Sequence, residues 1–195
     1  MPSTSQRVFA LAAIALALAG VGAARADVAP GGYVPPEPRA KVFPVARSKW
    51  YSVINFSDDW HAPRMRFTAG RWRQIGFHEG NDIFAEPRTP VRAITDGTVE
   101  REGWLFYSGW RVGVRGDDGR YWFYAHLAKP PIVVQGQRVE AGQNIGLVGN
   151  TGYGQTPGHM DEFRAHLHVG IQEPSGEWVN PHPLMKRLYE DALSR

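Results

Sequence analysis

Apolar and polar positions alternate with a period of two in several separate stretches of this chain. Val112 and Val114 have polar or small neighbours, and Leu167, Val169 and Ile171 repeat the same alternation. A period of two places successive side chains on opposite faces, which is typical of a strand with one buried face. This alternation, with dense β-branched and aromatic residues, predicts strands within 91–93, 97–99, 112–114, 121–127, 143–148 and 167–171.

Only the C-terminal end of the chain has a helical pattern. Leu184, Leu188 and Ala192 recur every four residues within 183–194, which predicts a short helix. Turn-forming runs such as RGDDGR at 115–120 separate the predicted strands. The fold class that follows is mainly β, with antiparallel sheets, glycine-rich connections and a short C-terminal helix.

The first 26 residues have the composition of a secretory signal peptide. Arg7 precedes the uncharged stretch VFALAAIALALAGVGAA, and Ala24-Arg25-Ala26 supplies a small-x-small cleavage site. An uncleaved anchor is the alternative, although a stretch this short and this rich in alanine and glycine is marginal for a membrane span. Cleavage predicts an exported protein, periplasmic or secreted, without stable membrane insertion.

Two further parts follow the signal peptide. Residues 27–45 contain five prolines and few apolar side chains, and we interpret them as an extended lead-in that drapes over the domain or is mobile. Residues 46–195 have the length of one domain. Because the chain has no cysteine, disulfides, thiolate metal sites and a cysteine nucleophile are excluded.

The net charge gives no support for a polyanionic partner. The chain has 22 basic and 19 acidic residues, and loss of Arg7 and Arg25 with the signal peptide leaves 20 basic residues against 19 acidic ones. Runs of like charge that would suit a nucleic acid or a membrane surface are missing from the sequence as well. We therefore expect no nucleic-acid partner.

The most informative histidines lie in the last predicted strand, within RAHLHVGIQ at 164–172. Alternation places His166 and His168 on the face opposite Leu167 and Val169. Their backbones are about 6.5 to 7 Å apart, one pleat along the strand, so both imidazoles can converge on one site in different roles. A histidine pair of this kind is also often structural, with neutral, hydrogen-bonded rings.

A second motif, FHEGND at 77–82, separates a histidine from an aspartate by three residues. In an extended strand His78 and Asp82 would be about 13 Å apart, too far for two ligands that each lie about 2 Å from one zinc ion. The backbone must bend, and we expect Gly80 to allow this because it has no Cβ. With His168 from another strand, the pair would form a three-ligand site with an open fourth position. Taken alone, the motif is more often a solvated loop.

Three histidine motifs in this order resemble those of the lysostaphin-type (LytM-like) zinc endopeptidases, which cut peptide bridges in the bacterial cell wall. The resemblance extends from about Phe43 to Pro183. The stretches that carry it are HEGND at 78–82, TPVRAITDGTV at 89–99, YAHL at 124–127, GQRVEAGQNIGLVGNTG at 136–152 and HLH at 166–168.

This resemblance implies a groove between β-sheets with one Zn²⁺ on its floor, held by His78, Asp82 and His168. It also implies that His126 and His166 are the catalytic histidines, which orient and deprotonate the attacking water or stabilise the developing charge. Which histidine does which is open. The substrates implied are peptidoglycan peptides, either cross-links or stem peptides.

The resemblance leaves an alternative function open. A catalytically silent wall-binding or regulatory protein of the same fold would activate another cell-wall hydrolase, but such a protein is expected to lack one or more ligands, and all five positions are present here. A regulatory protein partner is also an open possibility for an active enzyme.

The chain departs from the family pattern at three places near the motifs, one of which is Val169, where a phenylalanine is common. Arg88 stands where a glycine usually precedes Thr-Pro-Val, and the loop 156–165 before HLH is longer and more highly charged than usual. We expect the loop to border the groove and affect specificity, with His159, Asp161 and Glu162 in solvent.

Overall fold

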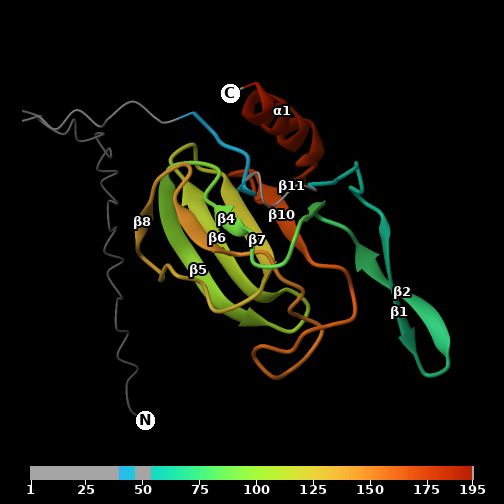
Figure 1. Ribbon diagram of the computed structural model, residues 1–195. Helices are drawn as coiled ribbons and strands as arrows, with labels where there is room; N and C mark the ends of the chain where they lie inside the picture. The colour runs from blue at the N-terminus through green and yellow to red at the C-terminus, as the bar shows by residue number, and fades with distance from the viewer. Residues whose placement is uncertain (1–39, 47–53, 195) are drawn as a thin grey trace, which may run out of the picture. The chain divides into compact units, whose positions relative to one another are not determined.

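The computed structural model describes residues 40–46 and 54–194; the predicted signal peptide and most of the lead-in lie outside them. The described residues form a seven-stranded sheet, two separate strand pairs and one helix (Figure 1). All strand pairings in this part of the chain are antiparallel. The elements are β1 (Pro63–Thr68), β2 (Arg71–Phe77), β3 (Asn81–Phe84), β4 (Pro90–Arg92), β5 (Gly97–Leu105), β6 (Gly109–Gly116), β7 (Tyr121–Leu127), β8 (Arg138–Val139), β9 (Asn144–Leu147), β10 (His166–Gln172), β11 (Trp178–Val179) and α1 (His182–Leu193).

The predicted fold class, mainly antiparallel β with a short C-terminal helix, is confirmed. Within the large sheet the order is β11-β10-β7-β6-β5-β8, and β3 also pairs with β10. The β10 strand is therefore hydrogen-bonded to β7 on one edge and to β3 and β11 on the other. Among the described residues, no helix is long and apolar enough to cross a membrane.

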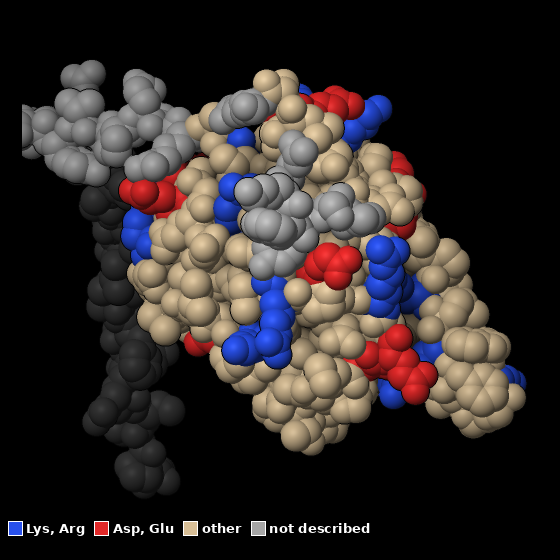
Figure 2. Space-filling view, in the orientation of Figure 1, with Lys and Arg blue, Asp and Glu red and all other residues tan. Residues whose placement is uncertain are grey.

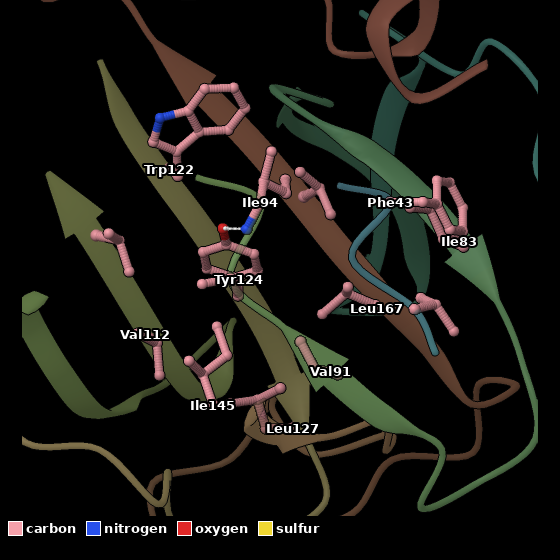
Figure 3. Close-up of a cluster of buried hydrophobic side chains, with 14 of the residues drawn as sticks. Phe43, Ile83, Val91, Ile94, Val112, Trp122, Tyr124, Leu127, Ile145 and Leu167 are labelled. Carbon is pink, nitrogen blue, oxygen red and sulfur yellow. Dashed lines mark hydrogen bonds between the residues drawn. The ribbon is translucent and has the colours of Figure 1, made fainter. Parts of the chain in front are cut away.

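The core lies between the large sheet and the β4–β9 pair. Trp122 and Tyr124 of β7 are completely buried, and the Tyr124 hydroxyl oxygen accepts a hydrogen bond from the backbone N–H of Ile94 at 2.9 Å (Figure 3). Val91 and Ile145, from the strand pair, fill the same space. A polar hydroxyl is tolerated at this depth because it has a partner.

The end of the predicted lead-in is part of this core. Phe43 and Val45 are buried, and Val45 forms an isolated β-bridge with Val91. The Phe43 ring also packs 5.0 Å from that of Tyr189 on α1. The packed chain therefore includes residues that the proline content had led us to place outside the domain.

The β1–β2 hairpin is an element that the alternation had not led us to predict. It projects from the side of the large sheet (Figure 1), and Phe67 and Trp72 on it are exposed and pack edge to face at 5.5 Å. Ala69 and Gly70 at its tip have φ angles of 51° and 74°, as a two-residue type I′ turn requires. Neither face of this hairpin is buried, so its alternation does not indicate a core strand.

Candidate metal centre

Three side chains that the sequence places far apart meet on one face of the large sheet. Asp82 on β3 lies directly opposite His168 on β10, and His78 lies three residues before the first residue of β3. The Nε2 atom of His78 lies 2.9 Å from Nδ1 of His168, and both nitrogens lie 3.0 Å from Oδ1 of Asp82. The strand register therefore brings together the three ligands that were predicted.

This donor set fits a zinc ion. Ligand atoms that each lie about 2.0 to 2.2 Å from a tetrahedral zinc are about 3.3 Å apart, so these three atoms need to separate by only a few tenths of an ångström. Two imidazole nitrogens and one carboxylate oxygen are also the ligands of a known class of catalytic zinc sites, in which the fourth position stays open. The residues present can therefore hold the metal that the resemblance implies.

Asp59 orients His78 by contacting Nδ1, the ring nitrogen that points away from Asp82 and His168. The Nδ1 atom of His78 lies 3.0 Å from the backbone oxygen of Asp59 and 3.1 Å from its Oδ2. The other carboxylate oxygen accepts a hydrogen bond from the Asn81 amide at 2.7 Å. A carboxylate on the outer nitrogen fixes the ring orientation and leaves Nε2 of His78 for a metal.

The backbone bends at Gly80, as expected, but glycine is required there for space and not for a left-handed backbone conformation. Its φ angle is outside the left-handed region in which glycine is favoured. A Cβ added at Gly80 would lie 2.3 Å from Cε1 of His168 and 2.7 Å from the backbone oxygen of Val169. Only glycine lets the chain between His78 and Asp82 pass this close to the third ligand.

The carboxylate of this centre is strongly stabilised as an anion. Burial acts to raise the pKa of Asp82, but hydrogen bonds from His168 and His78 outweigh burial and hold that pKa well below its usual range. Burial likewise acts to lower the pKa of His78, but hydrogen bonds to Asp59 and Asp82 raise it to about 9. Burial lowers the pKa of His168. In the metal-free protein the centre therefore pairs an ionised Asp82 with a protonated His78.

Arg64 holds the second oxygen of the same carboxylate. Its Nη2 atom donates a hydrogen bond to Oδ2 of Asp82 at 3.1 Å. Arg64 comes from β1, so the projecting hairpin is tied to the centre at its base. With Oδ2 occupied in this way, Asp82 presents a single oxygen, Oδ1, to the two histidines.

The two predicted catalytic histidines lie side by side next to the centre. The rings of His126 and His166 are 4.8 Å apart, and Nε2 of His166 is 3.7 Å from Oδ1 of Asp82. Nδ1 of His126 lies 2.7 Å from the backbone oxygen of Thr151, and Nδ1 of His166 lies 2.8 Å from that of Arg164. Because carbonyl oxygens only accept, each Nδ1 carries the proton and each Nε2 has a free lone pair.

The glycine-rich segment at 146–152 sets the position of His126. The backbone oxygen of Thr151 accepts a hydrogen bond from the His126 ring. The Thr151 hydroxyl donates to the backbone oxygen of Leu127 at 2.6 Å and accepts from the backbone N–H of Trp110 at 3.1 Å. His126 itself has a φ angle of 61°, which is uncommon for a residue other than glycine. Burial, reinforced by the neighbouring His166 and His168, lowers the pKa of His126 to about 3.

A groove of about 330 Å³ opens over His78, His126 and His168. Phe77 and Arg64 line it on the hairpin side, and Tyr107, Tyr153 and Trp178 line it elsewhere. On the face seen in Figure 2, acidic and basic side chains form small scattered groups among uncharged residues. The lining residues, rather than the face in Figure 2, define the groove: its walls are mainly aromatic and apolar around a polar floor.

The remaining histidines do not join the site. His61 stacks on Trp60 with ring centroids 4.5 Å apart, and His159 is exposed on its loop. His182 lies 3.3 Å from Oδ1 of Asn81 and thus supports the residue beside Asp82 without reaching the centre.

The sequence analysis missed Asp59, Arg64 and Thr151 as supporting residues. Asp59 and Arg64 precede the first motif, in a stretch with no recognisable pattern. Thr151 lies within the quoted glycine-rich stretch, so the motif itself pointed to it. Phe163, from the loop 156–165, was also missed: its ring lies 4.9 Å from that of His126.

Comparison with known proteins finds a matching family model and similar sequences. Residues 76–181 match the model of peptidase family M23, and this range contains all five predicted site residues. Over 130 residues the chain is 42% identical to the L-Ala–D-Glu endopeptidase of Bacillus subtilis, a match covering 62% of this chain and 39% of that protein. Over 119 residues it is 45% identical to the glycyl-glycine endopeptidase ALE-1 of Staphylococcus capitis, covering 57% of this chain and 30% of that protein. Each match thus spans less than half of the relative's length.

Solved structures show the same similarity. A structure described as a putative glycyl-glycine endopeptidase LytM from Ruminococcus gnavus superimposes with a TM-score of 0.65 at 32% identity, covering 77% of this chain and 61% of that one. The catalytic domain of lysostaphin from Staphylococcus simulans superimposes with a TM-score of 0.52 at 31% identity, covering 68% of this chain and 92% of that one.

Proposed function

Because the chain belongs to peptidase family M23, as the resemblance indicated, we propose that it is a zinc-dependent endopeptidase that hydrolyses peptide bonds of bacterial peptidoglycan. One observation carries the proposal: Nε2 of His78, Nδ1 of His168 and Oδ1 of Asp82 lie within 3.0 Å of one another on the floor of a groove. When bound there, zinc would lower the pKa of water and polarise the scissile carbonyl.

The surrounding residues give the two catalytic histidines different roles. The Nε2 atom of His166 has its lone pair free and lies 3.7 Å from Oδ1 of Asp82, beside the metal centre, so we assign to His166 the proton of the attacking water, which it passes to the leaving amine. His126 has a pKa of about 3 and stays neutral, so its Nε2 accepts a hydrogen bond from that water and orients it. Thr151 keeps His126 in the tautomer that this role requires.

The substrate class follows from the relatives, whose names specify different bonds. The Bacillus relative is an L-Ala–D-Glu endopeptidase, the Staphylococcus capitis one is a glycyl-glycine endopeptidase, and a Vibrio cholerae relative is a peptidoglycan DD-endopeptidase. The proposal therefore extends to peptidoglycan peptides as a class. Export through the predicted signal peptide is part of it, because such a substrate lies outside the cytoplasm.

The alternative, a silent regulator of another hydrolase, has less support. All five site positions are occupied by the expected residue types, and the three ligand atoms are already close together. A protein that only binds the wall has no need of His126 and His166 with their Nε2 lone pairs free.

The test combines metal content with hydrolysis. The protein, a His168→Ala variant and a His159→Ala control would each be assayed for bound zinc and for release of new amino termini from purified sacculi. We expect about one zinc per chain and cleavage in the parent and the control, with both lost in His168→Ala. Zinc binding without cleavage would favour the regulator, and absence of zinc from the parent would overturn the proposal.

A further inference from the structure

A second hollow, of about 470 Å³, adjoins the groove over the metal centre. Phe123 and Trp178 line both spaces, so a ligand that extends from one enters the other. The charged residues that line the second hollow are three arginines and one glutamate, namely Arg101, Arg111, Arg115 and Glu100.

Strand register puts this hollow and the metal centre on the same face of the large sheet. On β6, Arg111 and Arg115 alternate with the buried Val112 and Val114, so the arginines point away from the core. Gly113, between the arginines, lies opposite Phe123 of β7.

The same face continues along β7 to the metal centre. Ala125, two residues after Phe123, lies opposite His168 of β10. The floor therefore runs from His168 past Phe123 to Gly113 and Arg111. Position 113 accommodates only glycine, because a Cβ there would lie 1.9 Å from the Tyr121 hydroxyl. The floor therefore has no side chain at this point.

Arg115 and Glu100 form a hydrogen-bonded ion pair. Nε of Arg115 donates to Oε2 of Glu100 at 2.7 Å, and Nη1 donates to the backbone oxygen of Gly119 at 3.0 Å. The Arg115 guanidinium also lies over the Tyr121 ring, 5.2 Å from its centroid. The single acid of the hollow is thereby neutralised, and the charge that remains comes from Arg101 and Arg111.

The Arg111 guanidinium, unlike that of Arg115, has donor atoms without a hydrogen-bond partner in the described part of the chain. Its Nε and Nη1 atoms are covered from solvent and have no hydrogen-bond partner within the described residues. Covered guanidinium donors without a partner are unfavourable, because they lose water and gain no acceptor in exchange. Arg111 lines the hollow and has no ion-pair partner within the described residues, so a carboxylate that enters the hollow can pair with its charge.

We infer that Arg111, assisted by Arg101, binds a carboxylate of the substrate peptide and makes this site selective for acidic peptides. This inference rests on the proposed function and specifies its substrate: the scissile bond lies over the metal centre, and the carboxylate lies further along the groove floor. An acidic residue near the cleaved bond is consistent with the L-Ala–D-Glu specificity in the name of one relative.

Binding of two matched peptides to metal-free protein tests the inference. The probes are a synthetic wall peptide containing L-Ala–D-Glu with a free glutamate carboxylate, and the same peptide with that carboxylate converted to a carboxamide. Isothermal titration would be carried out with chelated protein, so that hydrolysis does not compete. We expect the acid to bind at least about tenfold more tightly than the amide, because a hydrogen-bonded ion pair is lost in the amide.

Two variants test whether Arg111 causes the preference for the acidic peptide. Arg111→Gln should bind both peptides equally, whereas Arg187→Gln, which removes the same charge from the exposed face of α1, should keep the preference. Should Arg111→Gln fail to fold by circular dichroism, Arg111→Lys replaces it, with a preference reduced at least about threefold because an ammonium group lacks the fixed planar donors of the guanidinium.

The outcomes separate this inference from the proposed function. Equal binding of acid and amide by the parent, no measurable binding of the acid, or an undiminished preference in the Arg111 variant would overturn the inference. Preference for the acid without cleavage by zinc-loaded protein would overturn only the proposed function. Cleavage of both peptides without any preference would overturn only the inference.

Discussion

The Oδ2 atom of Asp59 lies 3.1 Å from Nδ1 of His78, on the side of the ring away from Asp82 and His168. The same carboxylate anchors Asn81, the residue next to Asp82. Two neighbouring parts of the candidate centre therefore depend on one side chain that lies outside the matched family range of 76–181.

Asp59→Ala should weaken zinc binding by about tenfold, the lower end of the range for outer partners of metal-binding histidines. The loss is limited because the backbone oxygen of Asp59, 3.0 Å from Nδ1 of His78, remains as an acceptor. Competition with a zinc-binding dye would measure the change. Asp58→Ala is the matched control, since the Asp58 carboxylate accepts from the half-buried Asn180 amide and the Trp60 backbone N–H and contacts none of the ligands, so zinc affinity should be unaltered.

Gly80→Ala should remove zinc and destabilise the fold by about 1 to 3 kcal/mol, because the added methyl group overlaps the His168 ring and the rigid backbone oxygen of Val169. Zinc per chain and urea unfolding would be measured on the same preparation. Glu79→Ala, a change at the exposed preceding residue, should retain both properties. Normal zinc content in Gly80→Ala would contradict the close-approach explanation.

The free energy of unfolding should decrease as the pH is lowered, because His126 is buried in a neutral form. Its pKa is about 3 in the folded protein and 6.5 for the ordinary side chain, so below pH 6.5 the unfolded chain takes up a proton that the folded chain does not. Folding stability is therefore fully present above pH 6.5 and is lost between pH 6.5 and about 3, by up to about 1.4 kcal/mol per pH unit.

Urea unfolding of metal-free protein between pH 7 and 5 would measure this slope. His126→Gln cannot take up the proton and should show a shallower slope than the parent over that interval. Equal slopes would mean that His126 is protonated as easily in the folded protein as in the unfolded chain.

Arg88→Gly should stabilise the protein by about 0.5 to 1 kcal/mol. Arg88 has a φ angle of 68°, a left-handed conformation that is unfavourable by roughly 1 to 2 kcal/mol for residues other than glycine. Part of the gain is offset by the greater freedom of glycine in the unfolded chain. This conformation also explains why a glycine is usual before Thr-Pro-Val.

Arg88→Val is the opposite test, since a β-branched side chain suits this conformation even less than arginine does and should lower the melting temperature. Arg88 is exposed, so neither change disturbs the core. If glycine and valine had the same effect, backbone conformation would not be the cause.

The sequence predicted those parts of the fold in which side-chain alternation reflects burial. Val112 and Val114 face the core, as do Leu167 and Val169, and His166 and His168 lie on the opposite face as expected. The helix, predicted for 183–194, occupies His182–Leu193. Local periodicity was sufficient here because each of these elements has one buried face.

The rest depended on contacts between distant parts of the chain. Nothing in the local pattern around Arg64 indicates that it reaches Asp82, and the β1–β2 hairpin alternates without burying either face. The bend at Gly80 was expected but the need for space there was not, since that constraint comes from His168 on another strand. The motifs and the family resemblance indicated which residues to expect at the site but not what supports them.

The β10 strand is bordered on both edges, by β7 on one side and by β3 and β11 on the other. Its amide protons are therefore exchanged with solvent only when several strands separate together, which places them among the slowest to exchange in the domain. His166 and His168 are carried on this slowly opening strand. Removal of a metal ion by a chelator would then leave the scaffold of the centre in place, ready for the next ion.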